Sequence, residues 1–116
     1  MKFWVGVTDN SWFNFQQANK PDEVNFWQPS ATPPFKNAPS GMPFLFKLKK
    51  PNNYIAGGGF FVTYSTLPIS VAWDLFGEKN GANSLTGLLN LLSPLQQENK
   101  TDNLIGCTIL ASPFFF

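Results

Sequence analysis

The sequence predicts a mainly β domain with short helices (α+β), in which a curved sheet or a small mixed β-barrel of five or more strands closes on itself around one core. First, short runs rich in β-branched and aromatic residues recur along the chain, separated by Pro, Gly and Asn. Second, the longest run is interrupted by Gly57, Gly58 and Gly59, a pattern typical of a bulge or a barrel corner. Third, the helical patterns between the runs are all short. The length of 116 residues is that of a single domain.

Five segments are predicted to be strands because β-branched and aromatic residues dominate them. They are residues 2–8, 24–28, 44–49, 54–65 and 104–112. In the third segment, Phe44, Phe46 and Leu48 fall on one face, which is expected to be buried. Phe60 and Phe61, in the fourth, are expected in the core, as is Trp4 in the first.

Three short helices are predicted between these strands, at residues 10–20, 71–77 and 85–93. Each follows a side chain that can cap its first turn, namely Asp9 or Asn10, Ser70, and Asn83 or Ser84. The proline-rich segment 29–43 and the polar segment 96–103 are predicted to be loops.

The sparse charge and the lack of histidine limit the possible functions. The chain has eight basic residues, all of them lysine, against seven acidic ones, whereas domains that bind nucleic acid mainly by charge are far more basic. Without histidine there is no His metal ligand and no Ser–His or Cys–His nucleophile pair. No carboxylates have the spacing of an acid–base pair. We therefore expect no enzymatic activity in this domain, no metal and no cofactor.

The single cysteine, Cys107, allows no disulfide within the chain and is expected to be a buried structural thiol. This usage is compatible with a reducing compartment, so a cytoplasmic location is expected. No apolar run approaches the roughly 18 residues of a membrane span, and the first residues do not have the pattern of a signal peptide. We expect no contact with a membrane.

The segment VNFWQPS, from Val24 to Ser30, indicates a binding site. A strand that only fills a core would not surround its largest side chain, Trp27, with polar residues. Core packing alone remains the alternative for Trp27. However, aromatic side chains at the ends of elements, beside Asn and Gln, are how proteins stack a nucleobase and hydrogen-bond its edge. We therefore predict a base-binding pocket made of Trp12, Asn25, Phe26, Trp27, Gln28 and Ser30.

Three lysines, Lys47, Lys49 and Lys50, gather at the end of the third predicted strand. A solvated strand face would account for them, but their common edge also suits a phosphate backbone. We expect them to bind phosphates. The glycines at 57–59 do not form a dinucleotide fingerprint, because the spacing is wrong and no helix follows.

Together these segments resemble a known family. The chain resembles the N-terminal domain of bacterial HNH-type restriction endonucleases in three successive segments: FWVGVTDNSWFNF, VNFWQPS and GMPFLFKLKKPNNYIAGGGFFVTYSTLPISVAWDLFG. Their order is also similar to that of the wider PUA-like superfamily, which includes the EVE, YTH, ASCH and SRA domains. Motifs of EVE domains resemble residues 4–8, 25–30, 41–47 and 54–60.

The resemblance implies a single PUA-like, modified-base-binding domain over residues 1–116. It would be the DNA-binding specificity module of a modification-dependent restriction enzyme used in phage defence, and it would recognise a flipped, modified base. The three terminal phenylalanines, where a polar tail is usual, agree with a domain that begins a longer protein. The resemblance places an HNH nuclease domain in that protein, in cis.

Two features depart from the resembling families. EVE pockets often have basic residues where this chain has Ala31 and Thr32, and without arginine there is no bidentate phosphate clamp. Two other functions therefore stay open. The domain could read modified RNA, as relatives in the superfamily do, or it could be a protein-interaction module whose SPFFF end docks a partner domain.

Overall fold

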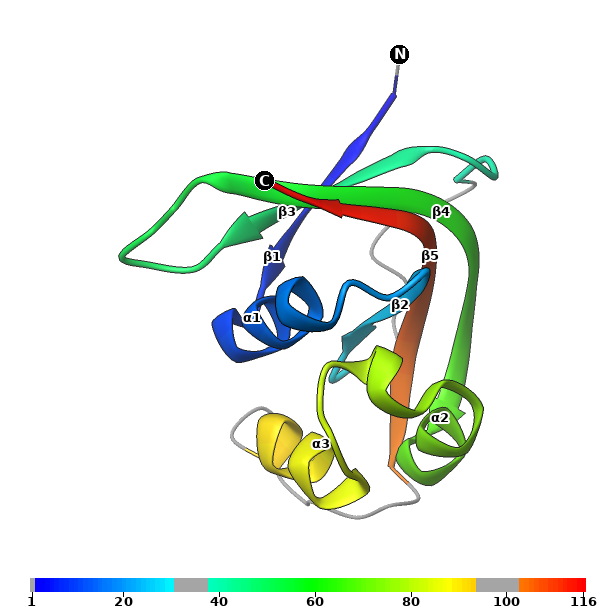
Figure 1. The fold of residues 1–116 in the computed structure, drawn as a ribbon. Coiled ribbons are helices and arrows are strands. Elements are labelled where there is room, and N and C mark those ends of the chain that lie inside the picture. The colour runs from blue at the N-terminus through cyan, green and yellow to red at the C-terminus, as the bar shows by residue number, and fades with distance from the viewer. Residues whose placement is uncertain (1, 31–37, 94–102) are drawn as a thin grey trace.

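The computed structural model describes residues 2–30, 38–93 and 103–116. These residues form a mixed five-stranded sheet with the order β1-β3-β4-β5-β2 and four short helical segments (Figure 1). The strands are β1 (Trp4–Thr8), β2 (Glu23–Gln28), β3 (Pro43–Leu48), β4 (Ile55–Pro68) and β5 (Leu104–Phe115). The helices are α1 (Asn10–Asn19), α2 (Ile69–Phe76), the 3-10 helix η1 (Gly77–Asn80) and α3 (Leu85–Leu92). The predicted mainly β fold with short helices is confirmed.

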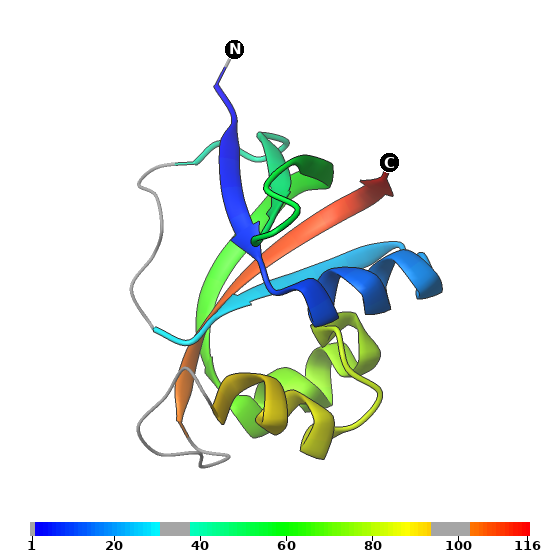
Figure 2. The same cartoon turned by 90° about the vertical axis from the view of Figure 1, so that its left-hand side faces the viewer.

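The two long strands β4 and β5 bend together and give the sheet its curvature (Figure 1). β3 pairs with the start of β4 and β2 pairs with the middle of β5 (residues 106–111), both antiparallel, while β1 runs parallel to β3. The two ends of the sheet therefore turn toward each other. Helix α1 lies in the angle between them, while α2 and α3 lie below β2 in both views (Figures 1 and 2).

The glycines at 57–59 are positions of irregular pairing, as predicted. The register shifts beside Phe46 in the β3–β4 pair and between Gly58 and Phe60 in the β4–β5 pair. A Cβ atom at Gly57 would overlap the main-chain oxygen of Phe114. Strand β5 thus passes so close to this glycine that no side chain fits, and residues 113–115 extend β5 beyond its predicted end.

The prediction that the sheet closes on itself is wrong. β1 and β2 are the two edges of the sheet and do not pair. The ring of Phe26 reaches across instead, since a Cβ on Gly6 would lie 2.8 Å from its Cζ atom. The indole N–H of Trp12 donates to the carbonyl of Asn25 at 3.2 Å and occupies part of the β2 edge. We call the unpaired gap between β1 and β2 the seam.

An aromatic core fills the concave side of the sheet. Trp12 packs edge-on against Phe26 and Phe46, with ring centroids 5.5 and 5.3 Å apart. Phe115 completes this cluster from β5, 5.7 Å from Phe13. Of the side chains predicted to be buried, Phe61 is buried and Trp4 is half-buried. Phe60 is 39% exposed, because its side chain lies on the outer face of β4.

Two of the predicted helix caps are confirmed. Asp9 accepts from the N–H of Trp12 at 3.1 Å, and Ser84 accepts from that of Gly87 at 3.0 Å. The predicted cap at Ser70 is wrong. β4 stays paired as far as Pro68, and α2 begins directly after it with no side-chain cap. In the described ranges, no helix is long and apolar enough to cross a membrane.

The predicted loops lie largely outside the described residues. Residues 31–37 of the proline-rich loop and residues 96–102 of the polar loop are not described. In the remainder of the first loop, a turn at Ser40 and Gly41 leads into β3.

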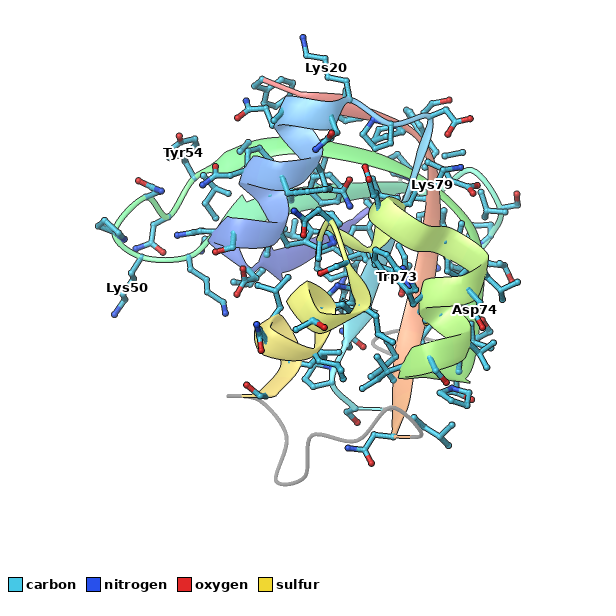
Figure 3. All side chains as sticks on the ribbon, turned by 60° about the horizontal axis from the view of Figure 1, so that its bottom comes forward. Lys20, Lys50, Tyr54, Trp73, Asp74 and Lys79 are labelled. Atoms are coloured by element: carbon cyan, nitrogen blue, oxygen red, sulfur yellow. The ribbon has the colours of Figure 1, made fainter. Side chains whose placement is uncertain are left out.

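An ion-pair cluster joins η1 to the start of β2. The Lys79 ammonium lies 3.1 Å from a carboxylate oxygen of Asp22 and 3.2 Å from one of Glu23 (Lys79 is labelled in Figure 3). The hydrogen bond and the charge of Lys79 lower the pKa of Asp22 below 3.8. The same contacts raise the pKa of Lys79 above 10.5.

Replacing Lys79 by methionine is therefore expected to lower stability in a pH-dependent way. The lowered pKa of Asp22 gives stability that is lost as pH falls below 3.8, and the raised pKa of Lys79 gives stability that is lost above pH 10.5. Between these limits the loss in Lys79→Met should be small, as is usual for exposed pairs. Urea unfolding of both proteins across this range checks it. A difference in stability that does not change with pH would show that the ion pairs contribute nothing.

Candidate functional site

A pocket of about 600 Å³ opens in the seam. It is lined by residues 4–7 of β1 and residues 26–30 of β2 and its following bend, together with Asp9, Trp12 and Lys49. The volume lies in the range of small-molecule sites. Because the sheet does not close, the place where a barrel would pair its first and last strands is occupied by a cavity.

The pocket includes most of the side chains that the sequence predicts for it. Trp12, Phe26, Trp27, Gln28 and Ser30 all line it. These residues come from the start of α1 and the end of β2, and the curvature of the sheet brings these two segments together.

Trp27 is both a buried side chain and a wall of the pocket. It is 8% exposed, and its indole N–H donates to the main-chain carbonyl of Asn80 at 2.8 Å. The indole N–H of Trp12 is likewise bonded within the fold. The side chains of both tryptophans are therefore held in fixed positions and can offer a ligand only their ring surfaces.

Asn25, the remaining predicted pocket residue, lies elsewhere. Its side chain is fully buried and donates from Nδ2 to Oδ1 of Asn80 at 2.8 Å. Asn80 in turn donates to the carbonyls of Ala72 and Gly77, at 3.0 and 2.8 Å. Asn25 thus belongs to a buried polar network behind β2, and that network also holds Trp27.

Asn80 is a residue that the sequence reasoning missed. No local pattern marks it, because an asparagine before a glycine is usual in any turn. Trp4, Gly6 and Asp9 were missed as pocket residues as well. Gly6 has a detectable signal, since a glycine inside a strand often marks a close approach. A Cβ there would lie 2.7 Å from the ring of Phe44.

Two polar side chains at the pocket are available to a ligand. Gln28 is half-buried, and its amide has no hydrogen-bond partner within the described part of the chain. The exposed ammonium of Lys49 has no ion pair with any described residue. The main-chain N–H of Lys49 donates to Oδ1 of Asn10 at 3.2 Å, which fixes the backbone beside the pocket.

The three candidate phosphate-binding lysines are in different surroundings. Lys49 lines the pocket. Lys47 is half-buried on β3, opposite Val7 of β1. Lys50 lies in the turn between β3 and β4 and points away from the body of the domain (Figure 3). Only Lys49 therefore borders the pocket directly.

Cys107 is buried, as expected, and its burial raises the pKa of the thiol. Among the described residues, no three acidic or cysteine side chains are grouped so that they could hold a metal ion. No protein-family model matches this chain, and no curated protein matches it significantly. A function must therefore be argued from the pocket itself.

Proposed function

We propose that this domain is a DNA-binding specificity module that holds a modified base, turned out of the double helix, in the seam pocket. The observation that carries the proposal is a pocket with tryptophan and phenylalanine walls and a glutamine amide that no described residue hydrogen-bonds. Aromatic surfaces suit the faces of a base, and an amide suits its edge because it both donates and accepts.

The energetics are compatible with a flipped base. Extruding a base costs a few kcal/mol, and each aromatic stacking surface returns about 1–3 kcal/mol. The indole hydrogen bonds of Trp12 and Trp27 hold these walls in place before binding. A preformed site of this kind loses little side-chain entropy when the ligand enters.

The proposed domain recognises DNA and does not cut it. In this proposal the open, curved sheet is a PUA-like fold, as the sequence resemblance implies. Cleavage then belongs to an HNH nuclease domain in cis, in a longer protein. The small net charge of +1 supports a specificity role, because weak non-specific binding does not mask the contribution of the pocket.

Binding to a panel of duplexes tests the proposal. The target position would carry cytosine, 5-methylcytosine, 5-hydroxymethylcytosine, its glucosylated form or N6-methyladenine, with RNA oligonucleotides of matched sequence alongside. We expect one modified duplex to bind more tightly than the unmodified duplex and the RNA. Equal binding to all duplexes would contradict base recognition, and preference for RNA would identify an RNA reader.

The Gln28→Ala variant should reduce this preference for the modified duplex. The Gln28 amide lines the pocket and has no hydrogen-bond partner among the residues that the structure describes, so its loss should weaken selectivity more than affinity. Gln17→Ala is the matched control, because Gln17 lies on α1 outside the pocket. The same loss of selectivity in both variants would argue against a contact between Gln28 and the base.

The salt dependence of binding should identify the phosphate contact. Each phosphate neutralised by a lysine adds about 0.9 to the slope of log affinity against log salt. Lys49→Gln should therefore flatten the slope by about 0.9 and leave the base preference unchanged. Lys20→Gln, at the far end of α1, is the control and should leave the slope unaltered. A slope that Lys49→Gln does not change would return Lys49 to an ordinary solvated surface.

A further inference from the structure

The peptide groups of β2 point alternately toward β5 and toward the seam. The N–H of Ser112 donates to the carbonyl of Asp22 at 3.1 Å, so the even-numbered residues of β2 face β5 in the register of this pair. The carbonyl of Asn25 accepts from Trp12, on the opposite side. Trp27 has the same parity as Asn25, so its N–H and C=O both point into the seam.

The edge strand β1 follows the same rule. The N–H of Leu48 donates to the carbonyl of Tyr54 at 3.0 Å, so the even-numbered residues of β3 face β4 and the odd-numbered ones face β1. β1 runs parallel to β3, with Val5 opposite Leu45. In a parallel pair, a residue hydrogen-bonds to the two residues that flank the one opposite it, so Leu45 bonds to Trp4 and Gly6. The peptide groups of β1 that bond to β3 are therefore those of the even-numbered residues. The peptide groups of Val5 and Val7 therefore point into the seam.

The pocket thus has main-chain donors and acceptors on two sides. Val5, Val7 and Trp27 all line it, and their peptide groups at the seam have no hydrogen-bond partner among the residues described. A ligand that excludes water must bond to these groups, because a buried peptide group without a partner is costly. A purely apolar ligand would leave them unsatisfied.

Within the pocket the available edge of β2 is a single residue long, because Trp27 lines the pocket while Glu23 and Asn25, which have the same parity, do not. The carbonyl of Asn25 is already occupied by Trp12, Gln28 points its peptide groups at β5, and Pro29 has no N–H. An added β-strand needs several consecutive peptide groups on its neighbour. The edge of a base needs only one donor beside one acceptor, which the N–H and C=O of one extended residue provide.

We infer that the peptide edge of Trp27 hydrogen-bonds the donor–acceptor edge of the bound base, so that the main chain, together with Gln28, selects the ligand. This inference rests on the proposed function. The ligand class is a planar heterocycle with an N–H donor next to an acceptor. The modification being read must then lie on another side of the ring, because a substituent that removes the donor would leave the Trp27 carbonyl without a partner.

Amide hydrogen exchange, followed by NMR, tests this inference. In the free protein, the Trp27 amide should exchange quickly and the Phe26 amide slowly, since Phe26 faces β5. The tightest-binding duplex of the panel should then protect the Trp27 amide. The Glu23 amide is the control, because Glu23 has the same parity but lies outside the pocket. A duplex whose target base is N,N-dimethylated at its exocyclic amine, and so lacks the donor, should bind at least about tenfold more weakly.

The possible failures are distinguishable. Slow exchange of Trp27 in the free protein would show that its peptide group is already paired and would overturn the inference. A duplex that binds selectively without protecting Trp27, or a dimethylated base that binds equally well, would leave the function standing and refute the inference. If no duplex binds, both fail. Protection of Val5, Val7 and Trp27 by a synthetic Val-Thr repeat peptide, without any response to DNA, would show strand pairing instead.

Discussion

Replacing Asn80 by alanine is expected to lower the free energy of unfolding by about 3–5 kcal/mol, because it leaves several buried polar groups without hydrogen-bond partners. Each such group costs about 1–3 kcal/mol, and these costs do not add fully. The Asn80 side chain accepts from Asn25 and donates to the carbonyls of Ala72 and Gly77. The contacts with Asn25 and Ala72 connect η1 to β2 and to α2, the contact with Gly77 lies within η1, and Asn80 is fully buried.

Asn80→Asp separates hydrogen bonding from packing. Aspartate keeps the size of the side chain but places an acceptor where Nδ2 now donates to two carbonyls. Its effect should be at least as large as that of alanine. Asn90→Ala, at an exposed position on α3, is the control and should change stability by less than about 0.5 kcal/mol. Urea unfolding gives all three values. Similar stabilities for the Asn80 and Asn90 variants would mean that the buried network does not hold the fold together.

Replacing Gly57 by alanine is expected to have the second largest effect, a loss of about 3 kcal/mol, at the upper end of the usual range for overpacking. The added Cβ would overlap the main-chain oxygen of Phe114, and a main chain in a paired strand cannot move aside as a side chain does. The β4–β5 pairing would have to separate at this point.

Gly59→Ala provides the comparison within the same glycine run. Its nearest neighbour would be a side-chain atom, Cβ of Leu110, at 3.0 Å. Adjusting a contact at that distance needs a smaller shift, so the loss of stability should be clearly less than in Gly57→Ala. Thermal or urea unfolding of the two variants compares them. Equal losses would mean that the approach of β5 to Gly57 is not what requires glycine there.

The Trp27→Ala variant cannot test the pocket alone, because Trp27 has a structural role as well. Because Trp27 is buried and bonded to Asn80 as well as lining the pocket, its removal should cost about 3–5 kcal/mol of stability, as for other buried tryptophans. Loss of binding in this variant would not separate the pocket from the core. Gln28→Ala is the cleaner probe, since the Gln28 amide has no partner in the described ranges.

Local sequence patterns were sufficient to predict the helices and strands and part of the pocket. The caps at Asp9 and Ser84 and the irregular pairing at 57–59 follow from side-chain hydrogen bonding and glycine geometry, which act within a few residues. The segment from 26 to 30 lines the pocket because aromatic and polar residues meet at the end of one strand.

What could not be predicted depends on contacts between distant segments. Both faces of β2 are covered, so its residues from Val24 to Trp27 are all buried, and alternation along the strand cannot tell which polar side chain reaches the pocket. Asn25 points to Asn80, 55 residues away in sequence. Closure of the sheet was wrongly expected for the same reason, since the ring of Phe26 and the indole of Trp12 lie between parts of the edge strands and the pocket separates the rest.

The central claim is that a base from DNA occupies the pocket in the seam, and the four tryptophan indole N–H signals test it in one NMR titration. Trp4, Trp12 and Trp27 line the pocket, while Trp73, which lies on α2 and is labelled in Figure 3, does not. Adding the tightest-binding modified duplex should shift the signals of Trp4, Trp12 and Trp27 and leave that of Trp73 in place. Shifts confined to Trp73, or no shift of any indole at saturating duplex, would contradict binding in the seam.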